Sequence, residues 1–291
     1  MSARWCVGVG SLTFASVTFL EALQSLGISF AVLALIFVPM ERTFTGRTQP
    51  HLRDGLRLDV LYFAAQYLVF MPFLLAANNR LQHWVGPTAP TALLEWVQEL
   101  PIYVQALLVV VLGDLLTYWA HRMSHEVPLL WRLHSVHHTA EKLDWMAAQR
   151  EHPLDGLYSQ ISLNLPGFLL GVDMLAIMPV FVFRGLCANF VHSNVKMRLG
   201  GLGLLFGDPV LHRWHHAKVS KTRHNFANLA PYLDVLFRTH HRPANENYPL
   251  GSVLLNTSGF SGHMLEPLLP ERAWQALPMS FQAMSRVKER G

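Results

Sequence analysis

Long stretches without charged residues fill much of the first 120 positions of the chain. Residues 22–40 and 60–78 contain no Asp, Glu, Lys or Arg, and each is close to the roughly 20 apolar residues that cross the core of a bilayer. Residues 100–120 form a third such stretch, in which Asp114 is the single acid. The pattern predicts two membrane-spanning helices and a candidate third, and an acid inside such a helix is by default a functional candidate.

A fourth apolar region, residues 156–192, is interrupted by Pro166, Gly167 and Gly171. Because these residues interrupt helices, two short helices that enter the membrane and return are expected here rather than one crossing. The return keeps the residues after position 192 on the same side as those before position 156. We therefore predict an all-α integral membrane protein with about four transmembrane or re-entrant helices.

Composition and charge support a membrane protein. Of the 291 residues, 51% are hydrophobic and 14% are charged, and the mean hydropathy is +0.25, which is unusual for a soluble enzyme. The net charge of +4 does not indicate nucleic-acid binding, because no basic helix carries interleaved aromatic residues. By the positive-inside tendency, the loop between the first two spans is expected in the cytoplasm, since it contains Arg42, Arg47, Arg53 and Arg57.

Two further features fit this topology. The first apolar stretch continues to Met40 without a small-residue cleavage site, so a retained anchor is expected rather than a signal peptide. Cys6 and Cys187 lack the close spacing of metal-binding cysteines and do not suggest a disulfide framework, which suits a reducing cytoplasmic face.

Histidines are concentrated in three clusters that follow the third apolar stretch. One has the spacing HxxxH and two have HxxHH: His121 and His125; His134, His137 and His138; and His212, His215 and His216. Residues three and four positions apart share one face of a helix, so each cluster is expected to offer its nitrogens from a single face. Neutral imidazole is a metal ligand, and eight nitrogens suit two metal ions.

Local signals predict the helices that carry these clusters. Asp208 is a good N-cap and Pro209 is favoured at the first helical position, which places the third cluster in the opening turns of a helix. Pro128 should end the third spanning helix soon after His125 and allow another helix to begin near Leu129.

Asp114 and Tyr118 lie on the same stripe of the third helix as His121 and His125, at spacings of four, three and four. Asp114 is either a helix-packing acid or a carboxylate that orients the outer N–H of a ligating imidazole. HxxxH alone is also typical of a helix interface, and HxxHH alone of a solvated helix face. Their recurrence in a chain poor in other charges favours a metal site.

Other histidines extend the set of candidates. His192, at the end of the fourth apolar region, is the best candidate for a ninth ligand, with a hydrogen-bonded interfacial residue as the alternative. His152 is open between a ligand and a structural hydrogen-bonding role. The histidines that follow the third cluster are expected at the surface or behind the ligands: His224, His240 and His241.

Nitrogen ligands alone do not choose between zinc, iron, copper and nickel. Structural zinc sites usually contain cysteine, and soluble di-iron bundles use Glu together with Glu-x-x-His; neither pattern is present. His125-Glu126 is followed by Val-Pro-Leu, so the HExxH sequence of zinc proteases is also absent.

Taken with their surroundings, these motifs resemble the fatty acid hydroxylase / sterol desaturase superfamily of membrane di-iron enzymes. The resemblance covers roughly residues 100–243. It rests on an ordered series of segments: Asp114 with Tyr118-Trp-Ala-His121-Arg, Pro128-Leu-Leu-Trp-Arg-Leu-His134, Val136-His-His138, Arg150-Glu-His-Pro153, His192-Ser-Asn194 and His212-Arg-Trp-His-His216.

The resemblance implies a four-helix membrane stalk beneath a cytosolic helical cap, with two irons where stalk and cap meet. It implies nine ligands: His121, His125, His134, His137, His138, His192, His212, His215 and His216. Asp114, Tyr118 and Asn194 are the candidate catalytic residues. The chain then divides into a membrane anchor region with two transmembrane helices (1–99), a catalytic domain (100–243) and a cytosolic C-terminal tail (244–291). Residues 225–227 and 233–239 depart from the family's pattern, which bears on the shape of the cap and hence on the substrate.

The activity that the resemblance implies is the use of O₂ to hydroxylate or desaturate a C–H bond of a lipid, which is a sterol, a fatty acyl chain, an ether lipid or a carotenoid. The electrons are expected from a separate protein of ferredoxin or cytochrome b5 type. Four basic residues are candidates either for its docking face or for contacts with lipid phosphates: Arg122, Arg132, Arg213 and Lys218. Two other classes remain open: a metal-dependent hydrolase or metal-handling membrane protein, and a non-catalytic scaffold in which metal ties helices together.

Overall fold

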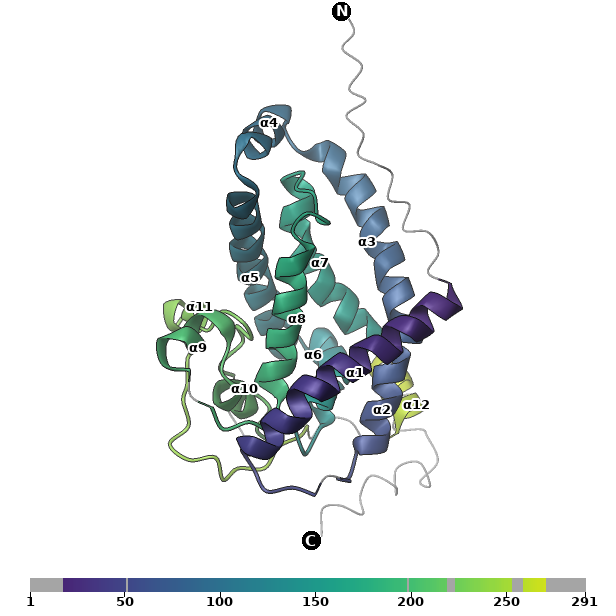
Figure 1. Cartoon of the computed structure of the whole chain (residues 1–291), viewed down its shortest axis with the longest axis vertical. Helices are drawn as coiled ribbons and strands as arrows, with labels where there is room; N and C mark the ends of the chain where they lie inside the picture. The colour runs from purple at the N-terminus through teal and green to yellow at the C-terminus, as the bar shows by residue number, and fades with distance from the viewer. Residues whose placement is uncertain (1–17, 51, 198, 219–222, 253–258, 271–291) are drawn as a thin grey trace, which may run out of the picture.

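The structure, a computed structural model, describes residues 18–50, 52–197, 199–218, 223–252 and 259–270. Over these residues the regular structure is helical apart from two isolated β-bridges, Thr45 with Val195 and Ala217 with Leu250. Long helices form an elongated upper part, and short helices and loops gather at the lower end (Figure 1). The predicted all-α fold is confirmed.

Among the described residues, three helices are long and apolar enough to cross a membrane, and they coincide with the three predicted stretches. They are α1 (Phe19–Thr43), a continuous helical run from Leu56 to Thr88, and α5 (Ile102–Glu126). The run consists of α2 (Leu56–Ala65), the π-helical turn η1 (Gln66–Phe70), α3 (Met71–Val85) and the 3-10 turn η2 (Gly86–Thr88). The short helix α4 (Thr91–Glu99) connects it to α5.

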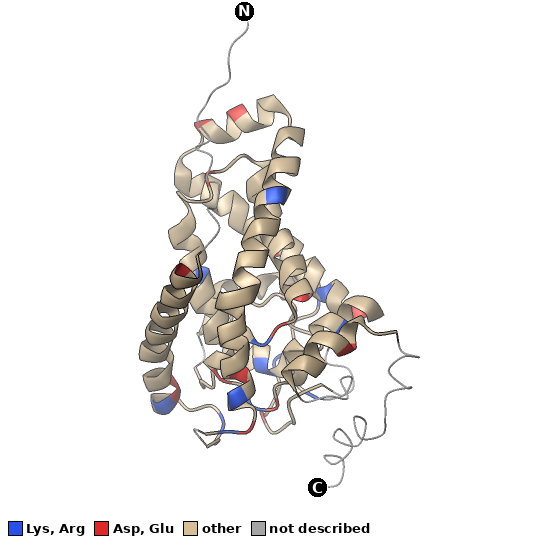
Figure 2. Ribbon diagram, turned by 90° about the vertical axis from the view of Figure 1, so that its right-hand side faces the viewer, with Lys and Arg blue, Asp and Glu red and all other residues tan. Residues whose placement is uncertain are grey.

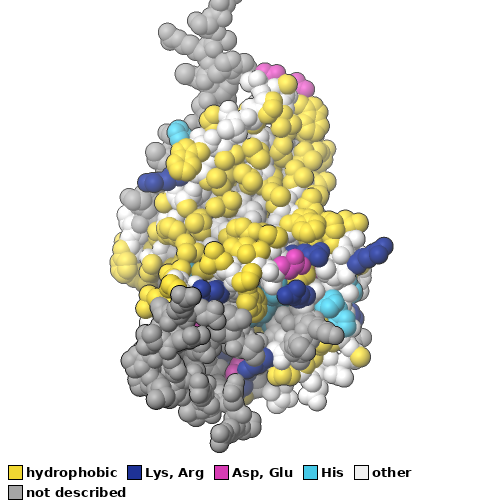
Figure 3. Space-filling model, turned by 180° about the vertical axis from the view of Figure 1, so that it is seen from behind, with side chains coloured by type: hydrophobic (Ala, Val, Ile, Leu, Met, Phe, Trp, Pro, Cys, Tyr) yellow, Lys and Arg dark blue, Asp and Glu magenta, His cyan; other side chains and the backbone are white. Residues whose placement is uncertain are grey.

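The apolar surface of these helices faces outward. Leu35 of α1 is 78% exposed, and only 11% of the most apolar part of α1 is buried, which in water would be a large hydrophobic patch. Hydrophobic side chains cover most of the upper part of the face seen in Figure 3, and most charged side chains lie in the lower half of the molecule (Figure 2). This separation fits an upper part whose helices are surrounded by lipid and a lower part that forms a polar cap.

The expected hairpin is formed by α7 (Pro153–Leu169) and α8 (Met178–His192). Pro166 lies inside α7 instead of ending it; the turn follows at Gly171, whose φ of +63° favours glycine. α7 packs against α5, and a Cβ on Gly113 of α5 would lie 2.8 Å from the carbonyl oxygen of Leu163. Close packing of the two backbones therefore holds the hairpin against the third span.

The lower part is built from short elements. After α5 come α6 (Pro128–His134), η3 (His137–Thr139) and η4 (Trp145–Gln149). After α8 come η5 (Gly200–Leu202), α9 (Gly203–Phe206), α10 (Pro209–His215), α11 (Tyr232–Leu236), α12 (Phe260–Leu265) and η6 (Glu266–Leu268). The two predicted helix starts are confirmed, because α6 begins at Pro128 and the Asp208 carboxylate caps α10 by accepting from the Val210 amide.

Part of the C-terminal tail is packed more firmly than its weak periodicity suggested. The Phe260 ring lies 5.0 Å from that of Tyr62 in α2, and the Tyr62 hydroxyl lies 3.0 Å from Nδ1 of His263. Much of the rest of the predicted tail, and the first 17 residues with Cys6, lie outside the described residues.

Candidate metal centre

Nine histidine side chains meet where the long helices end and the cap begins. They form two groups, and within each group the candidate ligand atoms all lie within 4.8 Å of one another. The first group consists of His121, His125, His134, His138 and His215, and the second of His137, His192, His212 and His216. These are the nine predicted residues, brought together from α5, α6, η3, α8 and α10.

The structure corrects one expectation about the HxxHH clusters, because neither presents all three nitrogens to one group. His134 and His138 belong to the first group while His137 belongs to the second. In the other cluster, His215 belongs to the first group while His212 and His216 belong to the second. In each cluster the two histidines four positions apart belong to the same group, and the remaining histidine belongs to the other group. Each HxxHH cluster therefore contributes side chains to both groups.

The outer nitrogens of five of these imidazoles are held by acceptors. A ring nitrogen that faces a carbonyl oxygen must carry the hydrogen, since a carbonyl only accepts. Such contacts fix the Nδ1–H tautomer of His121 (Phe226 O, 2.6 Å), His137 (Arg150 O, 3.0 Å), His192 (Ala188 O, 2.7 Å) and His215 (His224 O, 2.9 Å), and Nδ1 of His134 lies 2.8 Å from the Asp155 carboxylate.

With Nδ1 protonated, each of these rings turns an Nε2 lone pair inward. The Nε2 atoms of His121 and His134 are 3.0 Å apart, and so are those of His137 and His192. Two lone pairs at this distance repel each other, because neither nitrogen has a hydrogen to donate. Nε2 of His215 is buried without a hydrogen-bond partner among the described residues. The donor set therefore fits cations that accept these lone pairs.

The cluster is closed to water and kept neutral. His212, His215 and His216 are at most 2% exposed. Burial, together with repulsion from neighbouring imidazoles, lowers the pKa of His137, His138, His212 and His216 well below the ordinary value. Burial also lowers the pKa of His215 to about 3, against the effect of its hydrogen bond to His224. Neutral imidazole is the form that binds a metal.

The structure places Asp114 away from the histidines. Its carboxylate pairs with Arg184 of α8, with an Nη1–Oδ2 distance of 3.3 Å. A carboxylate that contacts one of the nine histidines is that of Asp155, in the first turn of α7. The pairing of Asp114 with Arg184 is the helix-packing contact that one of its two predicted roles expects. Its carboxylate does not contact the outer nitrogen of His121, which faces the backbone oxygen of Phe226.

Tyr118 and Asn194 also have structural partners. The Tyr118 hydroxyl lies 2.9 Å from Oγ1 of Thr239, and its ring stacks on Phe237. The Asn194 side chain exchanges two hydrogen bonds of 2.8 Å with the backbone of Arg47. Both residues thus connect the helix ends to the loops around the cluster.

Three further residues complete this description. His152 caps α7 by accepting from the Leu154 amide and belongs to neither group. His224 lies behind a ligand through its backbone oxygen. Of the proposed docking residues, Arg213 is 1% exposed and paired with Glu246, so it does not belong to an exposed face.

A groove of about 340 Å³ lies between α1 and the segment Asp144–Met146. Its wall on α1 changes along the helix from apolar to polar, with Phe30, Ala34 and Val38 followed by Glu41. Asn194, two residues after His192, also lines it. Since α1 is a candidate spanning helix, the apolar part of the groove is expected beside the lipid and the polar part at the cap.

Comparison with known proteins places this centre in a family. The family described as fatty acid hydroxylase matches residues 106–239, which include all nine histidines. An ornithine lipid hydroxylase of Rhizobium tropici is 34% identical over 178 residues, covering 59% of this chain and 53% of the relative. Human alkylglycerol monooxygenase is 30% identical over 131 residues, covering 42% and 27%.

A very-long-chain aldehyde decarbonylase of Oryza sativa subsp. indica is 28% identical over 137 residues, covering 46% of this chain and 52% of the relative. The chain thus spans about half of the length of the bacterial and plant relatives and about a quarter of the human one. No solved structure gives a significant match. The match over residues 106–239, together with the relatives, shows that this part of the chain is a fatty acid hydroxylase domain.

Proposed function

We propose that this chain is an integral membrane oxidoreductase that holds two iron ions among nine histidines and uses O₂ to oxidise a C–H bond of a lipid. The observation that carries the proposal is the pair of buried groups of imidazoles in which Nε2 atoms converge while the outer nitrogens of five rings are held by acceptors. The similarity to a lipid hydroxylase, a lipid monooxygenase and an aldehyde decarbonylase supports an oxidative reaction on a lipid.

The iron pair, when bound, supplies the activation of O₂ and the removal of hydrogen from an unactivated C–H bond. The protein contributes geometry and environment. His121, His125, His134, His138 and His215 would hold one ion and His137, His192, His212 and His216 the other. The acceptors behind the rings fix their orientation, and burial excludes water from the reacting groups. Hydroxylation is favoured over desaturation because two of the three relatives described above are a hydroxylase and a monooxygenase.

The amphipathic groove beside α1 supports an amphiphilic substrate that arrives from the bilayer with its polar end toward the cap. Electrons would come from a separate protein of ferredoxin or cytochrome b5 type that docks on the cytoplasmic side. Lys218 is exposed on the cap and remains in the proposed docking face, as do the partly exposed Arg122 and Arg132.

The proposal is tested by metal analysis of natively purified protein together with comparative lipid mass spectrometry of cells with and without the chain. Two irons per chain and a lipid that gains one oxygen or loses two hydrogens are expected. His215→Ala and His137→Ala, one from each group, should abolish the lipid change while leaving membrane insertion intact, because insertion depends on the apolar spans.

The same measurements distinguish the other classes. Zinc in place of iron, with no O₂ consumption, would instead indicate a hydrolase or metal-handling protein. Metal that is needed for helical structure but produces no lipid change would indicate a scaffold.

A further inference from the structure

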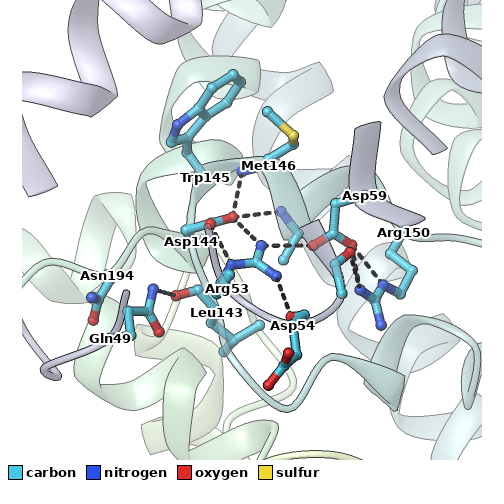
Figure 4. Close-up of polar contacts among 12 residues, drawn as sticks. Gln49, Arg53, Asp54, Asp59, Leu143, Asp144, Trp145, Met146, Arg150 and Asn194 are labelled. Atoms are coloured by element: carbon cyan, nitrogen blue, oxygen red, sulfur yellow. Dashed lines mark hydrogen bonds and ion pairs between the residues drawn. The ribbon is translucent and has the colours of Figure 1, made fainter. Parts of the chain in front are cut away.

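Asp59, a buried acid in the second span, lies at the centre of an ion-pair network that the sequence did not reveal. Its carboxylate, 0% exposed, accepts from Nη2 of Arg53 at 2.6 Å and from Nε of Arg150 at 2.7 Å. Arg53 also bonds both oxygens of Asp144 at 2.6 Å. Two arginines and two aspartates thus form a charge-balanced chain between α2 and the cap (Figure 4).

Arg150 connects this network to a histidine of the second group. Its backbone oxygen accepts from Nδ1 of His137 at 3.0 Å, and its guanidinium donates to Oγ1 of Thr139 at 3.2 Å. Arg150 therefore contacts both ends of the turn His137–Thr139. The position of its carbonyl, which fixes the tautomer and direction of the His137 ring, depends on where the guanidinium is anchored.

We propose that Asp59 is a positioning residue for the second histidine group, acting through Arg150 on His137. The carboxylate neutralises and orients a guanidinium that is itself buried, since Arg150 is 4% exposed. Without that charge, a buried Arg150 would be left without its counter-ion, which is strongly unfavourable, and the segment would have to shift to solvate it. The inference rests on the proposed function, because it assumes that the second group holds a metal.

The first group depends less on this network. Three of its five rings are oriented from elsewhere, by Asp155 behind His134, by Phe226 behind His121 and by His224 behind His215. Its link to Arg150 is His138, which lies inside the turn His137–Thr139. Loss of Asp59 should therefore weaken the second metal site much more than the first. Such an unequal effect separates positioning of His137 from a general loss of stability.

Asp59→Asn and Arg150→Lys are the test variants. Asparagine keeps the size of the side chain without its charge, and lysine keeps the charge and the backbone carbonyl but cannot bond Asp59 and Thr139 together. Arg184→Gln is the matched control. It breaks a different ion pair, the one between Arg184 of α8 and Asp114 of α5, and Arg184 does not contact a candidate ligand. Iron per chain is measured in natively purified protein during titration with a chelator.

We expect wild type and Arg184→Gln to retain two ions. Asp59→Asn and Arg150→Lys should retain one ion at close to wild-type affinity and release the other at roughly 10–100-fold lower chelator concentration, the range found when residues behind a ligand are lost. Wild-type retention of both ions in the two test variants would overturn the inference while leaving the proposed function standing. Equal weakening of both ions would also overturn it, since the network would then support the fold. Fewer than two ions in wild type would remove the proposed function itself.

Discussion

At the scale of single residues, Asp155 orients the imidazole of His134, for which the sequence suggested no carboxylate partner. His134 lies 21 positions earlier, on α6, and reaches the Asp155 carboxylate only because α7 folds back beside it. In the sequence, Asp155 resembles an ordinary acid in the first turn of a helix, where negative charge is generally favourable. Asp114 had the more conspicuous position, alone in an apolar helix, and pairs with Arg184 instead.

Asp155→Asn should weaken metal binding by the first group. The amide is neutral, so the charge-assisted hydrogen bond that fixes the Nδ1–H of His134 is lost, and a roughly 10–100-fold fall in affinity for one of two ions is expected. Iron content during chelator titration measures it. Asp173→Asn is the control, because Asp173 is an exposed acid at the turn of the same hairpin. An affinity equal to wild type would show that the His134 ring is held by packing alone.

The segment 225–227 shows that a departure from the family's pattern, Ala227 where the pattern has glycine, need not disturb the centre. Asn225 has a φ of 59°, in the left-handed region where asparagine is tolerated, and its side chain bonds the backbone oxygens of Leu211 and His241. The turn it forms places the oxygen of Phe226 on His121. The unusual Ala227 follows this contact and does not alter it.

At the scale of elements, α1 is both a candidate spanning helix and one wall of the groove. Its residues Phe30, Ala34 and Val38 follow at spacings of four, so they form one stripe of the helix. Leu35 points elsewhere and is 78% exposed. The helix thus presents one face to the groove and another to the lipid.

Ala34→Trp should obstruct the groove without disturbing insertion. If the lipid substrate occupies it, the amount of oxidised lipid in expressing cells should fall roughly tenfold or more, on the scale by which apolar pockets reject a misfit of a few methylenes. Lipid mass spectrometry measures the change, with Leu35→Trp as the control for a tryptophan on the lipid-facing side. If both variants gave equal amounts of product, the groove would have no part in substrate binding.

At the scale of the whole molecule, the three helices that could span a membrane and the returning hairpin gather the nine clustered histidines at one end. This arrangement requires the loop after α1 and the cap to lie on the same side of the membrane. The arginines of that loop favour the cytoplasm, and the loop contacts the cap directly, since the Arg47 guanidinium donates to the backbone oxygens of Tyr248 and Glu246.

Cysteine-accessibility labelling should therefore find Thr45→Cys and Lys218→Cys on the cytoplasmic side and Thr88→Cys on the other. All three positions are exposed, and Thr88 lies at the far end of the second spanning run. The variants are made after replacement of Cys6 and Cys187 by Ser, so that only the introduced thiol reacts. Labelling of Thr45→Cys and Lys218→Cys on opposite sides would contradict the returning hairpin.

The sequence by itself determined the long apolar helices, the positions at which α6 and α10 begin, and the nine histidines that meet. These follow from local causes: the length of apolar stretches, the fixed φ of proline, the capping carboxylate of Asp208 and the helical repeat. Tertiary structure alone decided how the HxxHH clusters divide into two groups and which residues stand behind each ring. Asp155, Arg150 and Phe226 reach their histidines across 13 to 105 positions, and such contacts depend on how helices pack, which no local pattern encodes.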